Sequence, residues 1–202
     1  MSKMLLTITG PSGCGKTSVL KEMMKSYGVS RVVTCTTREP RPGEKDGVDY
    51  HFLNGGEHYL FAVTEFAGNF YGISFVELMK QFRYNDVLAV VVDKKGAKKL
   101  CRRFADNDDI TVRNVYININ PKRALSHMAH RDGWSKAKKR QKADFEAGLY
   151  YDKYFEAAKD FDCIISNDRT NSIKNMARDI MNYIEAQKWT ERMEGYDSLE
   201  SA

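Results

Sequence analysis

Short apolar runs, each closed by polar or turn-forming residues, recur along this chain and predict buried β-strands. The first covers residues 4–9 and stops at Gly10-Pro11, and the run at 87–92 gives the strongest signal of this kind. Such continuous runs are typical of strands that are covered on both faces. Three further segments predict strands: 31–36, 112–119 and 162–166.

Between these strands, apolar positions recur every three or four residues, which predicts amphipathic helices. The first helical pattern stops at Gly28, and Pro121 stands where a helix favours its first residue. The predicted helices are 16–27, 74–83, 94–104, one that begins at Pro121, a long one from Arg131 toward Lys159, and 171–188. Strands that alternate with helices imply an α/β fold with a mostly parallel sheet and helices on both faces.

The composition is that of an ordinary globular protein, with 202 residues, 42% of them hydrophobic, and a formal charge of +5. The charge is uneven, because residues 131–142 carry six basic side chains against Asp132, whereas residues 189–202 carry four acids against one arginine. This distribution favours a local anion site over a nucleic-acid surface. We therefore expect no nucleic-acid partner, and we expect a frayed acidic tail after residue 188.

Four scattered cysteines form no C-x-x-C pair, which argues against a zinc site or a disulfide framework and favours a reducing cytoplasm. Gly10-Pro11 interrupts the first apolar run, and no later run approaches the length of a membrane span. The expectation is a soluble, cytoplasmic protein without a membrane partner, as a monomer or a homodimer.

One stretch, residues 10–17, has the spacing G-x-x-x-x-G-K-T between a predicted strand and a predicted helix. This order directs backbone N–H groups and the positive end of a helix at one point, which suits a polyphosphate. In such a loop Lys16 reaches the β- and γ-phosphates and the Thr17 hydroxyl holds Mg²⁺. The predicted ATP-binding residues are Gly10, Pro11, Ser12, Gly13, Cys14, Gly15, Lys16, Thr17 and Ser18.

Downstream, T-T-R-E-P-R-P-G-E at 36–44 and D-G-V-D-Y-H-F at 46–52 closely resemble the guanylate kinase family, whose members are P-loop nucleoside monophosphate kinases. G-N-F-Y-G at 68–72, D-K-K-G at 93–96 and the segment 162–168 resemble later motifs of that family in the same order. The resemblance implies ATP-dependent transfer, with Mg²⁺, of a phosphoryl group to GMP, dGMP or a related (deoxy)nucleoside monophosphate.

The resemblance also implies three parts: a core, a small β-rich subdomain that holds the acceptor, and a mobile lid. One guanylate-kinase-like domain would span 1–188, followed by an acidic tail at 189–202. Within that domain, the expected divisions are a core at 1–35, 84–127 and 159–188, an acceptor subdomain at about 36–83 and a lid at about 128–142.

Arg38 and Arg41, with tyrosines nearby, can bind a phosphate dianion through forked and hydroxyl donors. Asp93 follows a predicted buried strand, at the end of the sheet where α/β folds place their sites. The resemblance assigns six residues to the acceptor nucleotide: Thr34, Arg38, Arg41, Tyr50, Tyr71 and Asp93.

H-R-D-G at 130–133 resembles the arginine–glycine part of the family's lid, and Arg140 resembles its second arginine at a shorter spacing. The resemblance implies that both arginines close over the phosphates and exclude water. Met128 stands where the family often carries another lid arginine. The expected catalytic residues are Lys16, Arg38, Arg131 and Arg140.

The expected base pocket departs from the family pattern. Ala62 and Val91 stand where the family carries acidic residues, and Ile73 replaces a usual serine or threonine. A buried donor on the base without its partner can lower discrimination by about 10⁴, although Glu57 or Glu65 is another source of a carboxylate. Two acceptor hypotheses stay open: guanine nucleotides, or a changed or broadened base, such as another deoxynucleotide or a modified purine of the kind a virus makes.

Two other function classes also stay open. A sugar-phosphate kinase would also lack guanine-reading carboxylates, but the long match over 36–52 argues against it. A non-catalytic interaction module typically loses the phosphate loop, whereas Lys16 and Thr17 are both present.

Overall fold

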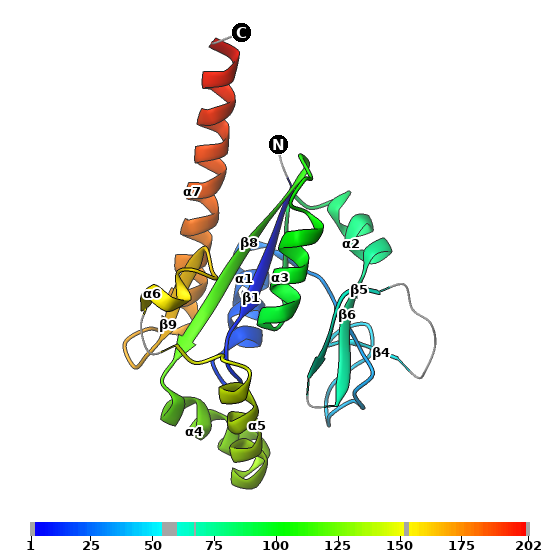
Figure 1. Ribbon diagram of the computed structural model, residues 1–202, viewed down its shortest axis with the longest axis vertical. Helices are drawn as coiled ribbons and strands as arrows, with labels where there is room; N and C mark the ends of the chain where they lie inside the picture. Colours follow the sequence, from blue (N-terminus) through cyan, green and yellow to red (C-terminus); the bar gives the residue numbers. More distant parts are fainter. Residues whose placement is uncertain (1–2, 54–59, 67, 152–153, 201–202) are drawn as a thin grey trace.

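A parallel β-sheet forms the centre of the molecule in the computed structural model, which describes residues 3–53, 60–66, 68–151 and 154–200 (Figure 1). Its strands follow the order β2-β7-β1-β8-β9, and each neighbouring pair is parallel. The strands are β1 (Lys3–Thr9), β2 (Ser30–Arg31), β7 (Val87–Val91), β8 (Ile110–Ile119) and β9 (Cys163–Asn167). The predicted α/β class with a mostly parallel sheet is confirmed.

Helices cover both faces of this sheet, which explains why its strands read as continuous apolar runs. On one face, side chains of β1 such as Leu6 pack with α1 (Lys16–Tyr27) and α7 (Ile173–Glu200). On the other face, Leu5 packs with α2 (Phe75–Phe82) and with α3 (Lys94–Arg103).

A second, smaller sheet lies beside the first, with the order β4-β3-β6-β5 (Figure 1). Its strands are β3 (Cys35–Thr36), β4 (His51–Phe52), β5 (Leu60–Phe66) and β6 (Asn69–Ser74). The single strand predicted at 31–36 is wrong, because the chain changes sheets within it. The N–H of Val32 still donates to the Ala89 carbonyl at 2.8 Å in the first sheet, whereas Thr36 pairs with Tyr71 in the second.

Residues 128–142, the segment predicted to be the lid, lie within a helical hairpin, α4 (Pro121–Asp132) and α5 (Trp134–Glu146), past the end of β8 (Figure 1). The long helix predicted toward Lys159 is wrong. It ends at Glu146 because Gly148 adopts a left-handed conformation with φ 62°. A separate short helix, α6 (Tyr154–Ala157), precedes β9.

The last helix, α7, continues to Glu200 and projects well beyond the sheet (Figure 1). The predicted helix end at residue 188 and the frayed tail are therefore wrong. Acidic residues alone do not end a helix, and no proline follows residue 188. In the described part of the chain, no helix combines the length and the apolar character needed to cross a membrane.

Candidate functional site

The loop between β1 and α1 depends on glycine at three positions, since Gly10, Gly13 and Gly15 have φ values of 151°, 79° and 100°. The packing around the loop also leaves no room for a side chain at two of these positions. A Cβ atom on Gly10 would lie 2.5 Å from the Ile117 carbonyl oxygen, and one on Gly13 would lie 2.7 Å from that of Ala124. The loop therefore needs glycine both for its backbone conformation and for its close packing.

Lys16 opens helix α1, and its ammonium donates to the carbonyl oxygens of Gly10 at 2.7 Å and Pro11 at 2.9 Å. The charge is thereby held at the predicted phosphate-binding loop. Thr17 and Ser18 lie exposed in the first turn of the helix. Cys14 is fully buried, and burial raises the pKa of its thiol, so it acts as a packing residue.

Three side chains from distant parts of the chain hold this loop. His127 Nδ1 lies 2.9 Å from the Gly13 carbonyl oxygen, and Asn167 donates to the Cys14 carbonyl at 2.8 Å. Asp144 accepts from the Ser12 backbone N–H at 2.8 Å. The loop is therefore tied to α4, to β9 and to α5.

One cleft of about 150 Å³ joins this loop to the smaller sheet and to α5. The loop contributes Gly10, Ser12 and Lys16 to its lining. The smaller sheet and its loops contribute Arg38, Arg41, Tyr50 and Tyr71, and the rest of the lining includes Thr34, Asp93, Arg140 and Asp144. The structure thus brings together the predicted donor loop and all six predicted acceptor residues.

Within this cleft, Arg38 is held by Glu44. Its Nη2 donates to both oxygens of the Glu44 carboxylate, at 2.9 and 2.8 Å, and its guanidinium carbon lies 5.2 Å from the centre of the Tyr50 ring. Burial lowers the pKa of Arg38, but the hydrogen bond and charge of Glu44 outweigh burial and raise it overall. Arg38 is therefore a fixed cation.

Arg41 differs, because its guanidinium forms no hydrogen bond or ion pair in the described part of the chain. Its backbone N–H donates to Glu44 at 2.8 Å, which orients the loop. The rings of Tyr50 and Tyr71 meet edge to face, 6.1 Å apart. Burial and the neighbouring Tyr71 raise the pKa of Tyr50, so its hydroxyl keeps its proton.

The two predicted lid arginines have different surroundings. Arg131 pairs with Asp132 at 2.7 Å and does not line the cleft, whereas Arg140 lines it and forms no hydrogen bond or ion pair among the described residues. Burial and the charges of Arg41 and Arg131 lower the pKa of Arg140. Met128 is fully buried against Gly13, so it is a packing residue.

Ala62, Ile73 and Val91, the three positions that depart from the family pattern, all line the cleft. Ala62 has a positive φ of 53°, beside an irregular register between β5 and β6. Asp93 caps helix α3 by accepting from the Gly96 N–H at 2.6 Å. Glu65 is exposed outside the cleft lining, and Glu57 lies outside the described residues.

Sequence reasoning missed two residues that line this cleft, Thr64 and Asp144, and a third, Glu44, that binds the lining residue Arg38. Glu44 was visible in the motif at 36–44, but nothing in the sequence pairs it with Arg38. Thr64 is buried and lines the cleft. The sequence after residue 53 does not match the family pattern in length, so the position of Thr64 could not be assigned from it. Asp144 could have been noticed only as an acid one helical turn after Arg140.

No cluster of three or more histidine, cysteine, aspartate or glutamate side chains that could hold a metal ion occurs among the described residues. The Thr17 hydroxyl is an exposed oxygen without a partner there. Mg²⁺ commonly takes one or two protein ligands and fills its remaining positions with phosphate oxygens and waters. The loop therefore fits Mg²⁺ that arrives with a nucleotide.

Comparisons with known proteins identify the family of this chain. Residues 2–187 match the model of the family described as guanylate kinase. A guanylate kinase of Gloeobacter violaceus is 33% identical over 108 residues, which cover 50% of this chain and 53% of that protein. One from Thiobacillus denitrificans is 38% identical over 118 residues, which cover 54% and 56%. The chain thus spans about half the length of these curated relatives.

A crystal structure of guanylate kinase from Anaplasma phagocytophilum has the same fold, with a TM-score of 0.63 and 22% sequence identity over 92% of this chain and 86% of that one. Since the family match extends over nearly all of the sequence, this protein belongs to the guanylate kinase family.

Proposed function

We propose that this chain is a nucleoside monophosphate kinase that transfers the γ-phosphoryl group of ATP to the 5′-phosphate of GMP or dGMP. The observation that carries the proposal is the single cleft shared by Lys16 of the phosphate loop and by Arg41 and Tyr71 of the smaller sheet. Two anionic phosphates can meet there only if positive groups surround them, and this lining supplies those groups.

In this mechanism, the backbone N–H groups of the loop and the start of α1 bind the donor phosphates. Lys16 exchanges its contacts with Gly10 and Pro11 for oxygens of the γ-phosphate. Arg41, Tyr50 and Tyr71 hold the acceptor phosphate in line with the donor. Mg²⁺, held through Thr17, would neutralise charge on the donor phosphates.

During transfer, the bond between the γ-phosphorus and its bridging oxygen breaks, and a bond to an oxygen of the acceptor phosphate forms. The products are ADP and a nucleoside diphosphate. Arg140, which lines the cleft and forms no hydrogen bond or ion pair among the described residues, stabilises the charge on the phosphoryl group as it moves. Arg38 contributes through a fixed charge, since Glu44 already holds its Nη2 group.

A broadened choice of base is the second candidate, and the lining of the cleft favours it. Ala62, Ile73 and Val91 contribute apolar side chains to that lining. The hydroxyls of Thr34 and Thr64 have no partner within the described residues. Because a hydroxyl both donates and accepts, these two groups can satisfy different base edges.

The test is a panel of ribo- and deoxyribonucleoside monophosphates, including modified purines, with ATP, Mg²⁺ and direct detection of diphosphate products. Preference for GMP or dGMP supports the first candidate, and comparable rates with several bases support the second. Ribose bisphosphate as an additional acceptor tests the sugar-phosphate kinase. Absence of transfer to every acceptor would favour the non-catalytic module and contradict the proposal.

We also propose that the protein works in a reducing cytoplasm, since all four cysteines are free thiols. Monomer and homodimer both remain compatible with the proposal, and light scattering distinguishes them.

A further inference from the structure

Asp144 is a buried carboxylate that lines the cleft, with an exposed fraction of only 1%. It belongs to α5, and its partner is the phosphate-binding loop. Oδ2 accepts from the Ser12 backbone N–H at 2.8 Å, and Oδ1 accepts from the Ser12 hydroxyl at 3.2 Å. Both oxygens therefore bind one residue of the loop, from a position far along the chain.

A buried carboxylate needs compensation, because removing the charge from water is costly. Burial raises the pKa of Asp144, while the hydrogen bonds from Ser12 and the charges of Lys16 and Arg140 lower it. Neither cation forms an ion pair with Asp144 in the described structure. Lys16 instead donates to carbonyl oxygens of the loop. The direct partner of Asp144 is thus a neutral backbone and hydroxyl pair.

Arg140 lies four residues before Asp144 on the same helix, so the two side chains share one face of α5. Both line the cleft, together with Lys16. Fixing Asp144 on Ser12 therefore fixes the rotation of α5 about its axis. That rotation decides whether Arg140 faces the loop or the solvent.

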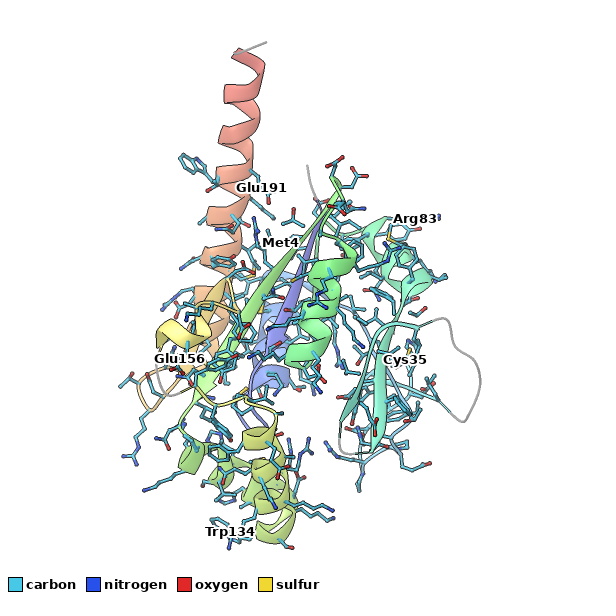
Figure 2. The ribbon with its side chains drawn as sticks, in the orientation of Figure 1. Met4, Cys35, Arg83, Trp134, Glu156 and Glu191 are labelled. Carbon is cyan, nitrogen blue, oxygen red and sulfur yellow. The ribbon has the colours of Figure 1, made fainter. Side chains whose placement is uncertain are left out.

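The other contacts of α5 are made outside the phosphate loop. Gln141 donates to the Pro121 carbonyl at 2.6 Å, which joins the helix to the start of α4. At its other end α5 begins after Gly133, and Trp134 lies at the far tip of the hairpin (Figure 2). Among the described residues, the hydrogen bonds between α5 and the phosphate loop come from Asp144.

We propose that Asp144 is a positioning residue: its contact with Ser12 docks α5 on the phosphate-binding loop and thereby places the Arg140 guanidinium over the transferring phosphoryl group. This inference rests on the proposed phosphoryl transfer. Misplacing a catalytic group by about 1 Å can cost about 10²-fold in rate, so a contact of this kind has a measurable effect.

The kinetic test compares Asp144→Asn, Asp144→Ala, Arg140→Ala and the Arg140→Ala/Asp144→Ala double variant. The asparagine oxygen still accepts from the Ser12 N–H, so kcat stays within about threefold of wild type. The alanine variant loses about 10²-fold in kcat, with a much smaller change in KM for ATP. The double variant is no slower than Arg140→Ala alone, because Asp144 acts through Arg140.

Glu146→Ala is the matched control, since this acid of the same helix is exposed and pairs only with Lys142 on the surface. Two kinetic results would overturn the proposal. Equal losses in Asp144→Asn and Asp144→Ala would show that the negative charge matters rather than the docking contact. Additive losses in the double variant would show that Asp144 acts independently of Arg140.

Hydrogen exchange on the full chain gives a readout that does not depend on activity. Asp144→Ala is expected to speed amide exchange in residues 134–149 and in the loop at 10–17, while Asp144→Asn and Glu146→Ala leave both unchanged. Unchanged exchange in Asp144→Ala would contradict the docking role. A wild-type protein that transfers no phosphoryl group would instead contradict the proposed function, so the two failures are distinguishable.

Discussion

The Arg38 guanidinium, which lines the cleft, and the Glu44 carboxylate form a charged hydrogen-bonded pair, with Nη2 at 2.9 and 2.8 Å from the two oxygens. Both side chains are largely shielded, with exposed fractions of 13% and 18%. Glu44 also accepts from the Arg41 backbone N–H at 2.8 Å. One acid thus orients both arginines of the predicted acceptor clamp.

Replacing this acid tests the relationship. Glu44→Gln is expected to raise KM for the acceptor nucleotide by about tenfold, because losing a hydrogen bond between charged groups costs about 1.5 kcal/mol. KM for ATP stays unchanged, since Glu44 lies outside the phosphate loop. Steady-state kinetics with each substrate varied separately measure both constants. The exposed Glu39→Gln is the control, and equal increases in both KM values would contradict the assignment.

Lys16→Ala is expected to lower kcat by at least about 10³-fold, because no neutral side chain replaces a cation at the transferring phosphoryl group. The fold is expected to remain, since the Lys16 ammonium contacts only the loop carbonyls and the Cys14 sulfur. Circular dichroism checks the fold, and product detection checks the rate. Turnover close to that of wild type would remove Lys16 from the mechanism.

Arg41→Ala is expected to raise KM for the acceptor nucleotide by about 10-fold to 100-fold, because a charged hydrogen bond to phosphate contributes about 1.5–3 kcal/mol. Affinity for ATP changes much less. Arg83→Ala is a matched control, as Arg83 is an exposed arginine at the end of α2, away from the cleft (Figure 2). If KM rises equally for the acceptor and for ATP, Arg41 does not belong to the acceptor clamp.

The phosphate loop could be predicted from the sequence because its requirements are local. Gly10, Gly13 and Gly15 stand within six residues, and each is needed for a conformation that the spacing already indicates. The central strands were predictable for a similar reason, since burial on both faces leaves a continuous apolar run.

The contacts that organise the cleft were not predictable, because they join residues that are distant in the chain. Asp144 and Ser12 are 132 residues apart, and no local pattern in α5 indicates the pair. The passage of the chain from one sheet to the other near Val32 is similar. The β-branched residues of this segment suit a strand of either sheet, so the composition does not indicate where the chain leaves the first sheet.

Asp160 provides a test of stability that is independent of catalysis. It accepts from Lys94 at 2.8 Å and from Lys98 at 2.7 Å. Burial raises the pKa of Asp160, but these hydrogen bonds and one from Tyr151 outweigh burial and lower the pKa to about 2. The Asp160 carboxylate therefore binds a proton less tightly in the folded protein than in the unfolded chain, where the pKa of an aspartate is about 3.9.

Because the folded pKa is depressed, the stabilisation is complete above about pH 4 and is lost as pH falls toward 2. Asp160→Asn is expected to lower the free energy of unfolding by about 1 kcal/mol at pH 7, after allowance for solvent screening. Urea denaturation at pH 7 and pH 2.5 measures the change, with the exposed Asp106→Asn as control. If Asp160→Asn lowers the free energy of unfolding by the same amount at both pH values, the ion pairs of Asp160 are not the source of the stabilisation.

Ala62→Glu tests which group reads the base. Ala62 lines the cleft, and its positive φ of 53° already carries the strain of a Cβ atom, so a longer side chain adds little backbone cost. The new carboxylate offers two acceptors to the N1–H and 2-amino groups of guanine. The ratio of kcat/KM for GMP over AMP is therefore expected to rise by about 10-fold to 100-fold. Ala62→Gln, of the same size without the charge, gives a smaller rise. If the ratio does not change in either variant, the base is recognised by other residues of the cleft.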